Sequence, residues 1–538
     1  MIRKFVLFFS LSLLLLHADF VIAQQNSISS EVSDSISMSA SDTLFIQTQD
    51  TTLIKINDTI VSIDKDTTGA PLSLDNVINL AIKQSSAVRY AQNEELNHYW
   101  RYQNFRTNFR PQLSLRSDLP EYSHKTEPIT QNDGSIKFRQ ISNLENSATI
   151  SLDQRIPQLG TYIYAATSLY RVQDFNKGDV EFSGSPFEIG FRQPIFGYNW
   201  MRWRKKTEPL VYEEAQRNFI ESIEEISLRA TNRFFWYLRV QTNYNLAKSN
   251  LENSQDNLEI AKTRQSLGRI SENDFSRIQL SVYSAQKDLN EAQMELKNAD
   301  FELKSYIGLD QAEDIELIMP LNIVFFDIDP DIAVEEALAN RKETPRSERR
   351  LIQAERELVK AKRNSGPQVT IEGSYGISNS AEDYRGVYKQ PEQQRELELS
   401  LRIPLLDWGR SASEVKLAES RRDLIEYDVE QDMKDFRREV IVQVEQFSLL
   451  REQLKTVREA DIVAENGYKI ALRKFQNGEI SITDLNIALS EREKAKRDYI
   501  RSLEDYWEAY YNLRMLTLYD FEIKQKISYD NPMIEESQ

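Results

Sequence analysis

The chain has 538 residues, of which 28% are charged, and its 67 Lys and Arg against 84 Asp and Glu give a formal net charge of −17. A mean hydropathy of −0.55 excludes a bundle of lipid-spanning helices, since each such helix needs ~20 mostly apolar residues. The acidic charge argues against nucleic acid as a partner, because phosphate binding depends on clustered Lys and Arg. With no cysteine and only three histidines, we expect no enzyme, no metal site and no cofactor.

Residues 1–23 have the three parts of a secretory signal peptide. Arg3 and Lys4 form the basic start, residues 5–16 form the apolar middle, and Ala23 is the small residue before the cut. The alternative, a membrane anchor, requires a longer apolar stretch. The mature chain is therefore expected to act outside the inner membrane, either as a soluble protein or inserted as β-strands.

Residues 24–70 are expected to form a flexible N-terminal extension. They contain 9 Ser, 7 Thr and 6 Asp, and this composition buries too little apolar surface to offset the entropy lost on ordering. Within the extension, residues 53–63 are predicted to pair as a small hairpin around Asn57 and Asp58.

The remainder is an internal duplication followed by a C-terminal tail. Pro367 follows Pro111 at an offset of 256, whereas Pro404 follows Pro194 at an offset of 210. The smaller offset then holds without a gap to the end of the second copy. The difference indicates an insertion of 46 residues in the first copy. We assign residues 71–319 to the first repeat, 320–520 to the second and 521–538 to the tail.

Each repeat is predicted to run helix, strand pair, very long helix, glycine turn and return helix. The first helix of each copy ends before a proline, which pushes the preceding residue out of the helical region. The long helix spans ~100 Å, so the two shorter helices, at ~55 Å each, would stack end to end along it. The helices are expected at 73–108, 198–266 and 272–308, and at 331–364, 408–476 and 482–518.

The strand pairs are predicted from residues that alternate between apolar and polar side chains, which suits a sheet with one apolar face. In the second copy, Leu397, Leu399 and Leu401 alternate with polar neighbours. The insertion is interpreted as an added hairpin at about 140–180, with a glycine turn near Gly160. Three positions for this hairpin stay open: the outer mouth, a lengthening of the strands, or a site elsewhere.

The return helices carry an apolar residue at alternating spacings of three and four. In the first copy this pattern runs from Phe275 to Tyr306, for more than four heptads. The pattern predicts antiparallel coiled coils, with an ordinary core stripe as the alternative. The expected fold class is therefore mainly α, with long coiled-coil helices and a smaller β part.

This arrangement resembles the TolC family of outer-membrane efflux channels, and the resemblance covers about 72–520. The most specific segments are 193–196 and 403–410, where strand passes into long helix, and 268–275 and 475–485, which resemble helical hairpin tips. The resemblance implies an outer-membrane homotrimer in contact with lipid. Each chain would give four strands to a 12-stranded transmembrane barrel and its helices to a periplasmic tunnel. The implied partners are a periplasmic adaptor (membrane fusion) protein and an inner-membrane transporter of the RND or ABC type.

The resemblance also assigns roles to the hairpin tips. The turns would dock the adaptor, and Asp484 would stand in a ring of carboxylates at a cation-selective constriction, with Asp274 as a second candidate. The alternative interpretation of both acids is that they stabilise helix N-termini. The expected docking residues are Leu267, Gly268, Arg269, Asn477, Gly478 and Glu479.

Two departures from the family pattern concern the closed gate and the membrane anchor. Phe475 and Ile480 stand where relatives often carry a tyrosine and an arginine that lock the gate. These positions are still assigned to the gate, but other contacts must close it, with Arg269, Glu479 and Asn273 as candidates. The lipidated N-terminal cysteine of many relatives is also missing.

Functions from other classes remain as alternatives. A periplasmic adaptor has one long helical hairpin instead of two, and a coiled-coil spacer would lack a pore. An enzyme is disfavoured because His98 and His124 have no spaced catalytic partner in the sequence. The nature of the exported substrate is not encoded in any of these patterns.

Overall fold

The computed structural model describes residues 55–56, 59–60, 72–131, 133–312, 315–320 and 323–537. It divides into two units, Met1–Thr67 and Thr68–Gln538. The expected signal peptide and most of the expected flexible extension lie outside the described residues. In the first unit, β1 (Lys55–Ile56) and β2 (Thr59–Ile60) pair antiparallel, which confirms the predicted hairpin.

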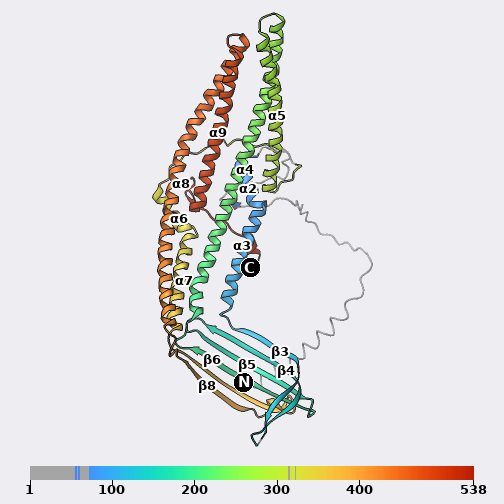
Figure 1. Ribbon diagram of the computed structural model, residues 1–538, viewed down its shortest axis with the longest axis vertical. Coiled ribbons are helices and arrows are strands. Elements are labelled where there is room, and N and C mark those ends of the chain that lie inside the picture. Colours follow the sequence, from blue (N-terminus) through green and yellow to red (C-terminus); the bar gives the residue numbers. More distant parts are fainter. Residues whose placement is uncertain are drawn as a thin grey trace, which may run out of the picture. The chain divides into compact units, whose positions relative to one another are not determined.

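The second unit has a sheet at one end and helices that run away from it to two hairpin turns (Figure 1). Both repeats follow the predicted order of elements. The first contains α2 (Leu74–Gln84), α3 (Ser86–Thr107), β3 (Gln112–Thr130), β4 (Ile136–Ile156), β5 (Thr161–Asp174), β6 (Asp179–Pro194), α4 (Trp200–Ser266) and α5 (Glu272–Ile307). The second contains α6 (Pro330–Asn340), α7 (Glu343–Asn364), β7 (Gln368–Ala381), the short helix η1 (Gly386–Tyr388), β8 (Glu392–Arg402), α8 (Arg410–Asn477) and α9 (Ile482–Thr517).

The helix lengths show the duplication directly. Helices α2 and α6 each have 11 residues, α3 and α7 each have 22, and α5 and α9 each have 36. The long helices α4 and α8 have 67 and 68 residues. The predicted bounds of the long and return helices are therefore confirmed to within two residues.

The prediction of one unbroken helix at 73–108 and another at 331–364 is wrong. Ser85 takes an extended conformation with ψ 150°, and its side chain accepts a hydrogen bond from the backbone N–H of Val88, so it ends α2 and caps α3. In the second copy Arg341 is extended in the same way, with ψ 156°. A serine cap inside an otherwise helical pattern is a weak sequence signal, because serine is also tolerated within helices.

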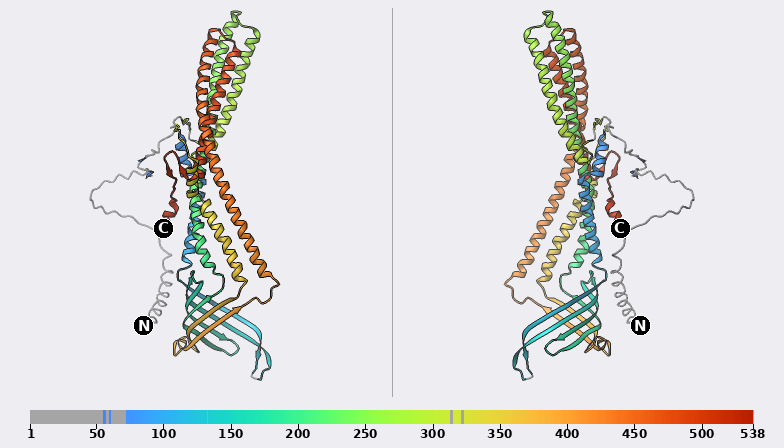
Figure 2. Two further views of the ribbon diagram at one scale, coloured as in Figure 1. Left: turned by 90° about the vertical axis from the view of Figure 1, so that its left-hand side faces the viewer. Right: turned by 90° about the vertical axis from the view of Figure 1, so that its right-hand side faces the viewer.

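The long helices contact the shorter ones as predicted. Helix α4 packs along α5 over its half nearest the turn and along α2 and α3 over its half nearest the sheet (Figure 2). Helix α8 packs in the same way along α9, α6 and α7. The two repeats also meet directly, since α4 contacts both α9 and α7.

The sheet contains six antiparallel strands in the order β3-β4-β5-β6-β7-β8. The expectation of four strands per chain is therefore wrong. The insertion forms the hairpin of β4 and β5, and this hairpin lies inside the sheet, where β4 pairs with β3 and β5 pairs with β6. An inserted pair of strands keeps the alternating directions of the original four, so the sheet accepts it without a change in connections.

One face of the sheet is apolar and open. Leu397 and Leu399 of β8 have 77% and 66% of their surface exposed, and Leu113 of β3 has 73% exposed. On the other face, Gly190 lies against an aromatic ring of the neighbouring strand. A Cβ atom on Gly190 would meet the ring of Tyr164 at 2.5 Å, so only glycine leaves room for that ring.

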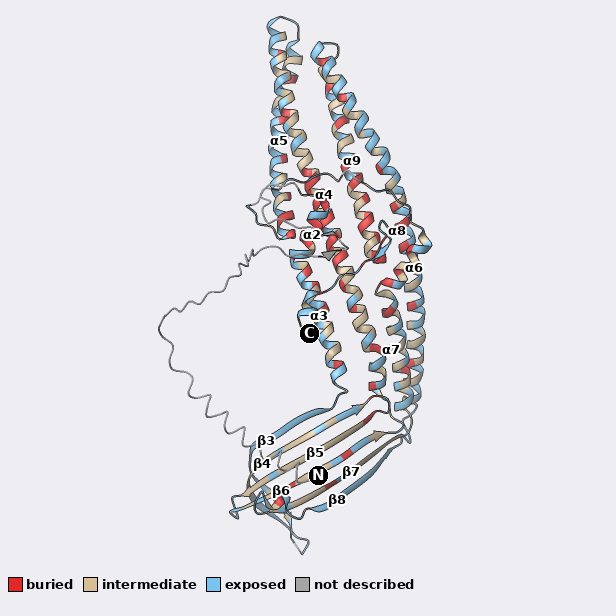
Figure 3. Cartoon of the chain, turned by 180° about the vertical axis from the view of Figure 1, so that it is seen from behind, coloured by how far each residue is buried: buried red, intermediate tan, exposed pale blue. Residues whose placement is uncertain are grey.

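The main apolar core lies midway along the helices, where α2, α4, α5, α6, α8 and α9 converge (Figure 3). Its largest fully buried side chains include Phe234, Phe235, Phe447, Leu503 and Tyr506. Burial raises the pKa of the Tyr506 hydroxyl to about 12, and this group donates a hydrogen bond to the carbonyl of Val324. Among the described residues, none of the helices combines the length and apolarity needed to cross a membrane.

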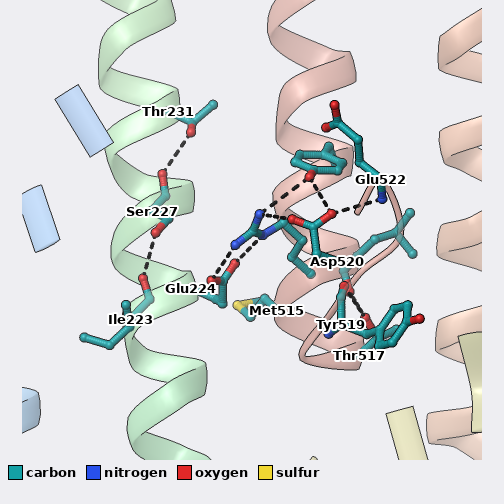
Figure 4. Close-up of polar contacts among 12 residues, drawn as sticks. Ile223, Glu224, Ser227, Thr231, Met515, Thr517, Tyr519, Asp520 and Glu522 are labelled. Atoms are coloured by element: carbon teal, nitrogen blue, oxygen red, sulfur yellow. Dashed lines mark hydrogen bonds and ion pairs between the residues drawn. The ribbon is translucent and has the colours of Figure 1, made fainter. Parts of the chain in front are cut away.

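A buried cluster of charged residues joins the two repeats to the C-terminal tail beside this core (Figure 4). The guanidinium of Arg514 on α9 contacts both carboxylate oxygens of Glu224 on α4, at 2.8 and 3.1 Å, and also contacts Asp520. Tyr529 donates a further hydrogen bond of 2.7 Å to Glu224. Burial alone would lower the pKa of Arg514, but the charge of Glu224 raises it above its ordinary value, so the guanidinium stays charged.

The C-terminal tail is an ordered part of this unit. Its strand β10 (Gln525–Lys526) pairs with β9 (Tyr519–Asp520) at the end of the second repeat, and it also forms the short helix α10 (Pro532–Glu536). Asn531 donates to the carbonyl of Gln92 on α3 at 2.9 Å and to the carboxylate of Glu95 at 3.1 Å. The tail therefore ties the end of the second repeat to the first helices of the first.

Candidate functional site

The candidate site consists of the two hairpin turns farthest from the sheet. Each turn uses a glycine in the left-handed region, Gly268 with φ +66° and Gly478 with φ +83°. After each glycine, the next backbone N–H returns to a carbonyl at the end of the long helix, from Arg269 to Arg264 and from Glu479 to Lys474. Both contacts are typical of a glycine-terminated helix, so these glycines have the turn-forming role that the sequence predicted.

Asp274 and Asp484 occupy equivalent positions in the first turn of their return helices. The carboxylate of Asp484 accepts hydrogen bonds from the backbone N–H of Ser481 at 3.0 Å and from its hydroxyl at 2.7 Å. The carboxylate of Asp274 accepts a bond from the hydroxyl of Ser271 at 2.7 Å. Both acids therefore stabilise a helix N-terminus, and the capping interpretation is confirmed. A role at a pore constriction is compatible with this geometry and stays a prediction.

The hydrogen bonds to Asp484 also fix its charge. The hydroxyl and then the backbone N–H of Ser481 lower the pKa of the Asp484 carboxyl below its ordinary value of 3.8. The side chain is exposed to solvent. Asp484 therefore keeps its negative charge to a lower pH than an aspartate without these hydrogen bonds.

Phe475 and Ile480 lie inside the second turn. Phe475 is buried together with Tyr468 and Leu485, and Ile480 packs against this small cluster. The cluster holds the ends of α8 and α9 together, so both residues stiffen the turn. Their assignment to the gate itself stays a prediction.

Arg264, in the last turn of α4, bridges from the first hairpin to the second. Its guanidinium donates to the backbone carbonyls of Phe475 at 3.3 Å and Gln476 at 3.4 Å. It also lies over the Phe475 ring, 5.6 Å from the centroid. A cation placed on the last carbonyls of a helix is stabilised by the negative end of the helix dipole. Arg264 is therefore the described residue that connects the two tips.

Arg264 was not among the closing contacts predicted from the sequence, which were Arg269, Glu479 and Asn273. In the structure Glu479 accepts a hydrogen bond from Asn477 of its own turn, at 3.1 Å. The available signal for Arg264 was a basic residue in the last turn of a helix, which usually indicates only a favourable interaction with that helix's own dipole. The packing of α4 against the second hairpin is what directs this side chain to α8.

Other polar contacts between the hairpins continue from the tips toward the core. Arg239 pairs with Glu504, and Asn250 donates to Glu493. Between them and the tips, asparagines and serines of the first hairpin face Leu485 and its apolar neighbours across a cavity of about 20 Å³. A cavity of this size has room for about one water molecule. The hairpins are therefore joined by individual polar contacts near the tips and by the apolar core farther away.

The turn residues proposed for docking are accessible. Leu267 is 63% exposed at the first turn, and Arg269, Asn477 and Glu479 are exposed as well. A Cβ on Gly268 would meet no heavy atom within 4 Å, so the space around this turn is open. Within the described part of the chain, no group of histidines and acids is arranged to hold a metal ion.

Comparison with known proteins gives one family and a set of solved structures. Residues 333–517 match the outer membrane efflux protein family. No curated protein matches the chain in sequence. The fold is similar to that of the *Campylobacter jejuni* CmeC outer membrane channel, with a TM-score of 0.61, 14% identity and coverage of 86% of this chain and 88% of that one.

Two further solved structures have the same fold. The outer membrane protein VceC from *Vibrio cholerae* gives a TM-score of 0.57 at 14% identity and covers 83% of this chain and 95% of its own. The open state of the *Neisseria gonorrhoeae* MtrE outer membrane channel gives 0.56 at 14% identity, covering 82% and 88%. These similarities extend over both repeats, whereas the family match covers the second alone.

Proposed function

We infer that this chain is an outer-membrane efflux protein of the TolC family, from the family match over residues 333–517 and from the fold that it shares with solved outer membrane channels. The chain is an outer-membrane efflux duct and not an enzyme. The observation that supports a gated duct is the pair of long helical hairpins, which leave the sheet and meet at their tips through Arg264. A periplasmic adaptor or a spacer without a pore finds no support in the family match or in the similar structures.

The duct is proposed to be a homotrimer. Each copy contributes its sheet to one outer-membrane barrel and its helices to one periplasmic tunnel. Lipid covers the apolar face of the sheet, which includes the exposed Leu397 and Leu399. At the junction of sheet and helices, Leu405 and Trp408 are 92% and 90% exposed. Tryptophan at this level suits the boundary between hydrocarbon and water, so this loop would mark the periplasmic surface of the membrane.

The gate is proposed to open when the hairpin of α4 and α5 separates from the hairpin of α8 and α9 near the tips. The contacts that must break there are polar, above all those of Arg264 with the end of α8. The apolar core midway along the helices stays packed, and the hairpins bend apart from that point toward the tips. The exposed turn residues then offer a periplasmic adaptor a surface through which an inner-membrane transporter of the RND or ABC type biases the gate.

Replacing Asp484 by asparagine is expected to reduce cation selectivity in a planar bilayer. Three carboxylates around a narrow opening concentrate cations, and their loss should lower the cation-to-anion permeability ratio roughly threefold or more. The ratio is measured from reversal potentials in a salt gradient. Because the hydrogen bonds of Ser481 lower the pKa of Asp484, the native selectivity should be retained at neutral pH and should fall only on strong acidification.

Asp274→Asn is the matched comparison, because it removes the equivalent capping acid from the other hairpin, which is also the second candidate for the constriction. A similar loss in both variants would contradict the assignment of the selectivity to Asp484 alone. An unchanged ratio in Asp484→Asn would remove this residue from the constriction. Absence of any current from a verified trimer would count against the duct itself.

A further inference from the structure

We propose that the two free edges of the six-stranded sheet pair between copies, so that three chains close one continuous barrel of eighteen strands. This inference rests on the proposed trimeric duct and changes the barrel that the sequence resemblance implied. The hairpin of β4 and β5 then becomes part of the wall. The partner of each free edge is a second copy of this chain.

The edges of the sheet require a partner in lipid. Within the described residues, β3 pairs only with β4, and β8 pairs only with β7. Each edge therefore presents a row of free backbone N–H and C=O groups, which cannot remain unpaired in a membrane. Because the sheet has an even number of strands, β8 of one copy and β3 of the next run in opposite directions, and their union continues the antiparallel pattern.

The sheet already has the stagger of a barrel wall. One unbroken row of paired residues runs from Gln112 across all six strands to Glu396, through Asp153, Tyr164, Gly190 and Ser374. Gln112 is the first residue of β3, whereas β8 continues for six residues beyond Glu396, to Arg402. The end of the sheet nearest the helices thus shifts by six residues from one edge to the other.

This stagger gives a strand tilt that suits a closed barrel. With the junction to the next copy counted as the sixth step, a shift of six residues per copy is one residue per strand. At ~3.3 Å per residue and ~4.8 Å between strands, the tilt is about 35°, which lies at the lower end of the range for barrels. The same shift brings Arg402 level with Gln112 of the neighbouring copy.

The side chains match in this register. Ser400 lies opposite Ser114 of the neighbouring copy, and Glu398 lies opposite Arg116, which gives an oppositely charged pair. On the other face, Leu399 lies opposite Leu115, so the apolar surface continues across the junction. Residues on one face thus meet residues of the same kind, as a half-buried sheet requires.

The estimated circumference of the helical tunnel fits a barrel of eighteen strands better than a barrel of twelve. Four helix ends join the sheet in each copy, those of α3, α4, α7 and α8. Twelve helices in a ring, spaced ~9 Å apart, have a circumference of roughly 110 Å. Eighteen strands at the tilt above give roughly 105 Å, whereas twelve strands give roughly 70 Å. The inserted hairpin therefore matches the barrel to the tunnel, and the outer opening does not narrow the passage.

Cysteine cross-linking in outer membranes tests this pairing, because the natural chain contains no cysteine. Ser114→Cys with Ser400→Cys is expected to give covalent dimers and trimers on non-reducing gels. Ser114→Cys with Leu399→Cys is the matched control, since adjacent residues of a strand point to opposite faces. Ser114→Cys with Ser151→Cys, whose hydroxyls lie 3.1 Å apart in the native chain, is expected to link within one copy.

The two links distinguish the possible outcomes. In a twelve-stranded barrel the hairpin of β4 and β5 would lie outside the wall, and β3 would pair with β6. Ser114→Cys would then link to Ser400→Cys of the next copy but not to Ser151→Cys on β4. That result would overturn the inference. A count of the strands in electron density of the trimer in nanodiscs decides the same question independently, with eighteen expected and twelve contradicting it. A conducting trimer with twelve strands leaves the proposed function intact, whereas absence of both trimer and current rejects that function.

Discussion

Replacing Arg514 by alanine is expected to lower the free energy of unfolding by about 3–5 kcal/mol, because it leaves a buried carboxylate without its partner. The side chain of Glu224 has no exposed surface, and Arg514 supplies both of its charged hydrogen bonds. Tyr529 alone would remain as a donor to Glu224. Thermal denaturation of the purified trimer, followed by circular dichroism, should show a lower midpoint for the variant.

The matched control for this prediction is Arg229→Ala, which breaks the pair with Glu225 one turn away on the same helix. Both side chains of that pair are about half exposed, and such surface pairs contribute roughly 0–1 kcal/mol. Equal midpoints for the two variants would show that the buried cluster contributes no more than a surface pair. The double variant Glu224→Gln with Arg514→Met should recover part of the loss, since it removes the charge of Glu224 together with that of Arg514 and leaves only Asp520 without its charged partner.

Replacing Arg264 by alanine is expected to favour the open gate strongly. Its hydrogen bonds and its contact with the Phe475 ring together contribute about 1–1.5 kcal/mol in each copy. When three copies open together, the open-to-closed ratio should rise by about 10² to 10³. Single-channel recording should show a larger mean conductance and longer open times, and cells carrying the variant should take up large antibiotics more readily.

Lys262→Ala is the control for Arg264, because Lys262 lies two residues away and pairs only within its own helix, with Glu259. It should leave the conductance unchanged. Arg264→Lys keeps the charge but loses the planar guanidinium group, so its mean conductance should lie between those of the native chain and the alanine variant. A native conductance in Arg264→Ala would contradict its role as the connection between the tips.

The regular parts of the fold could be predicted from the sequence because they depend on local patterns. The glycines at 268 and 478 and the long stretches between prolines fixed the two helical hairpins to within a few residues. The break at Ser85 was missed, because one cap in a helical pattern is weaker than the periodicity around it. The hairpin of β4 and β5 was recognised, but its place inside the sheet depends on pairing with β3 and β6, which are distant in sequence.

The candidate site shows the same division between local and distant contacts. The capping roles of Asp274 and Asp484 depend on serines three residues earlier, and they could be predicted. Arg264 acts on carbonyls 211 and 212 residues away in the chain. No spacing rule connects such positions, so only the packing of the hairpins reveals the contact.

The buried cluster around Glu224 makes the first repeat of the chain depend on residues that follow it. At the constant offset of the repeats, the counterpart of Glu224 is Lys434, whose side chain is 64% exposed and pairs with Glu430 on the surface. The first repeat thus carries a buried acid that depends on an arginine near the end of the second repeat and on a tyrosine of the C-terminal tail. The two repeats are therefore not interchangeable, because the buried acid of the first has its partners only in the segments that follow it.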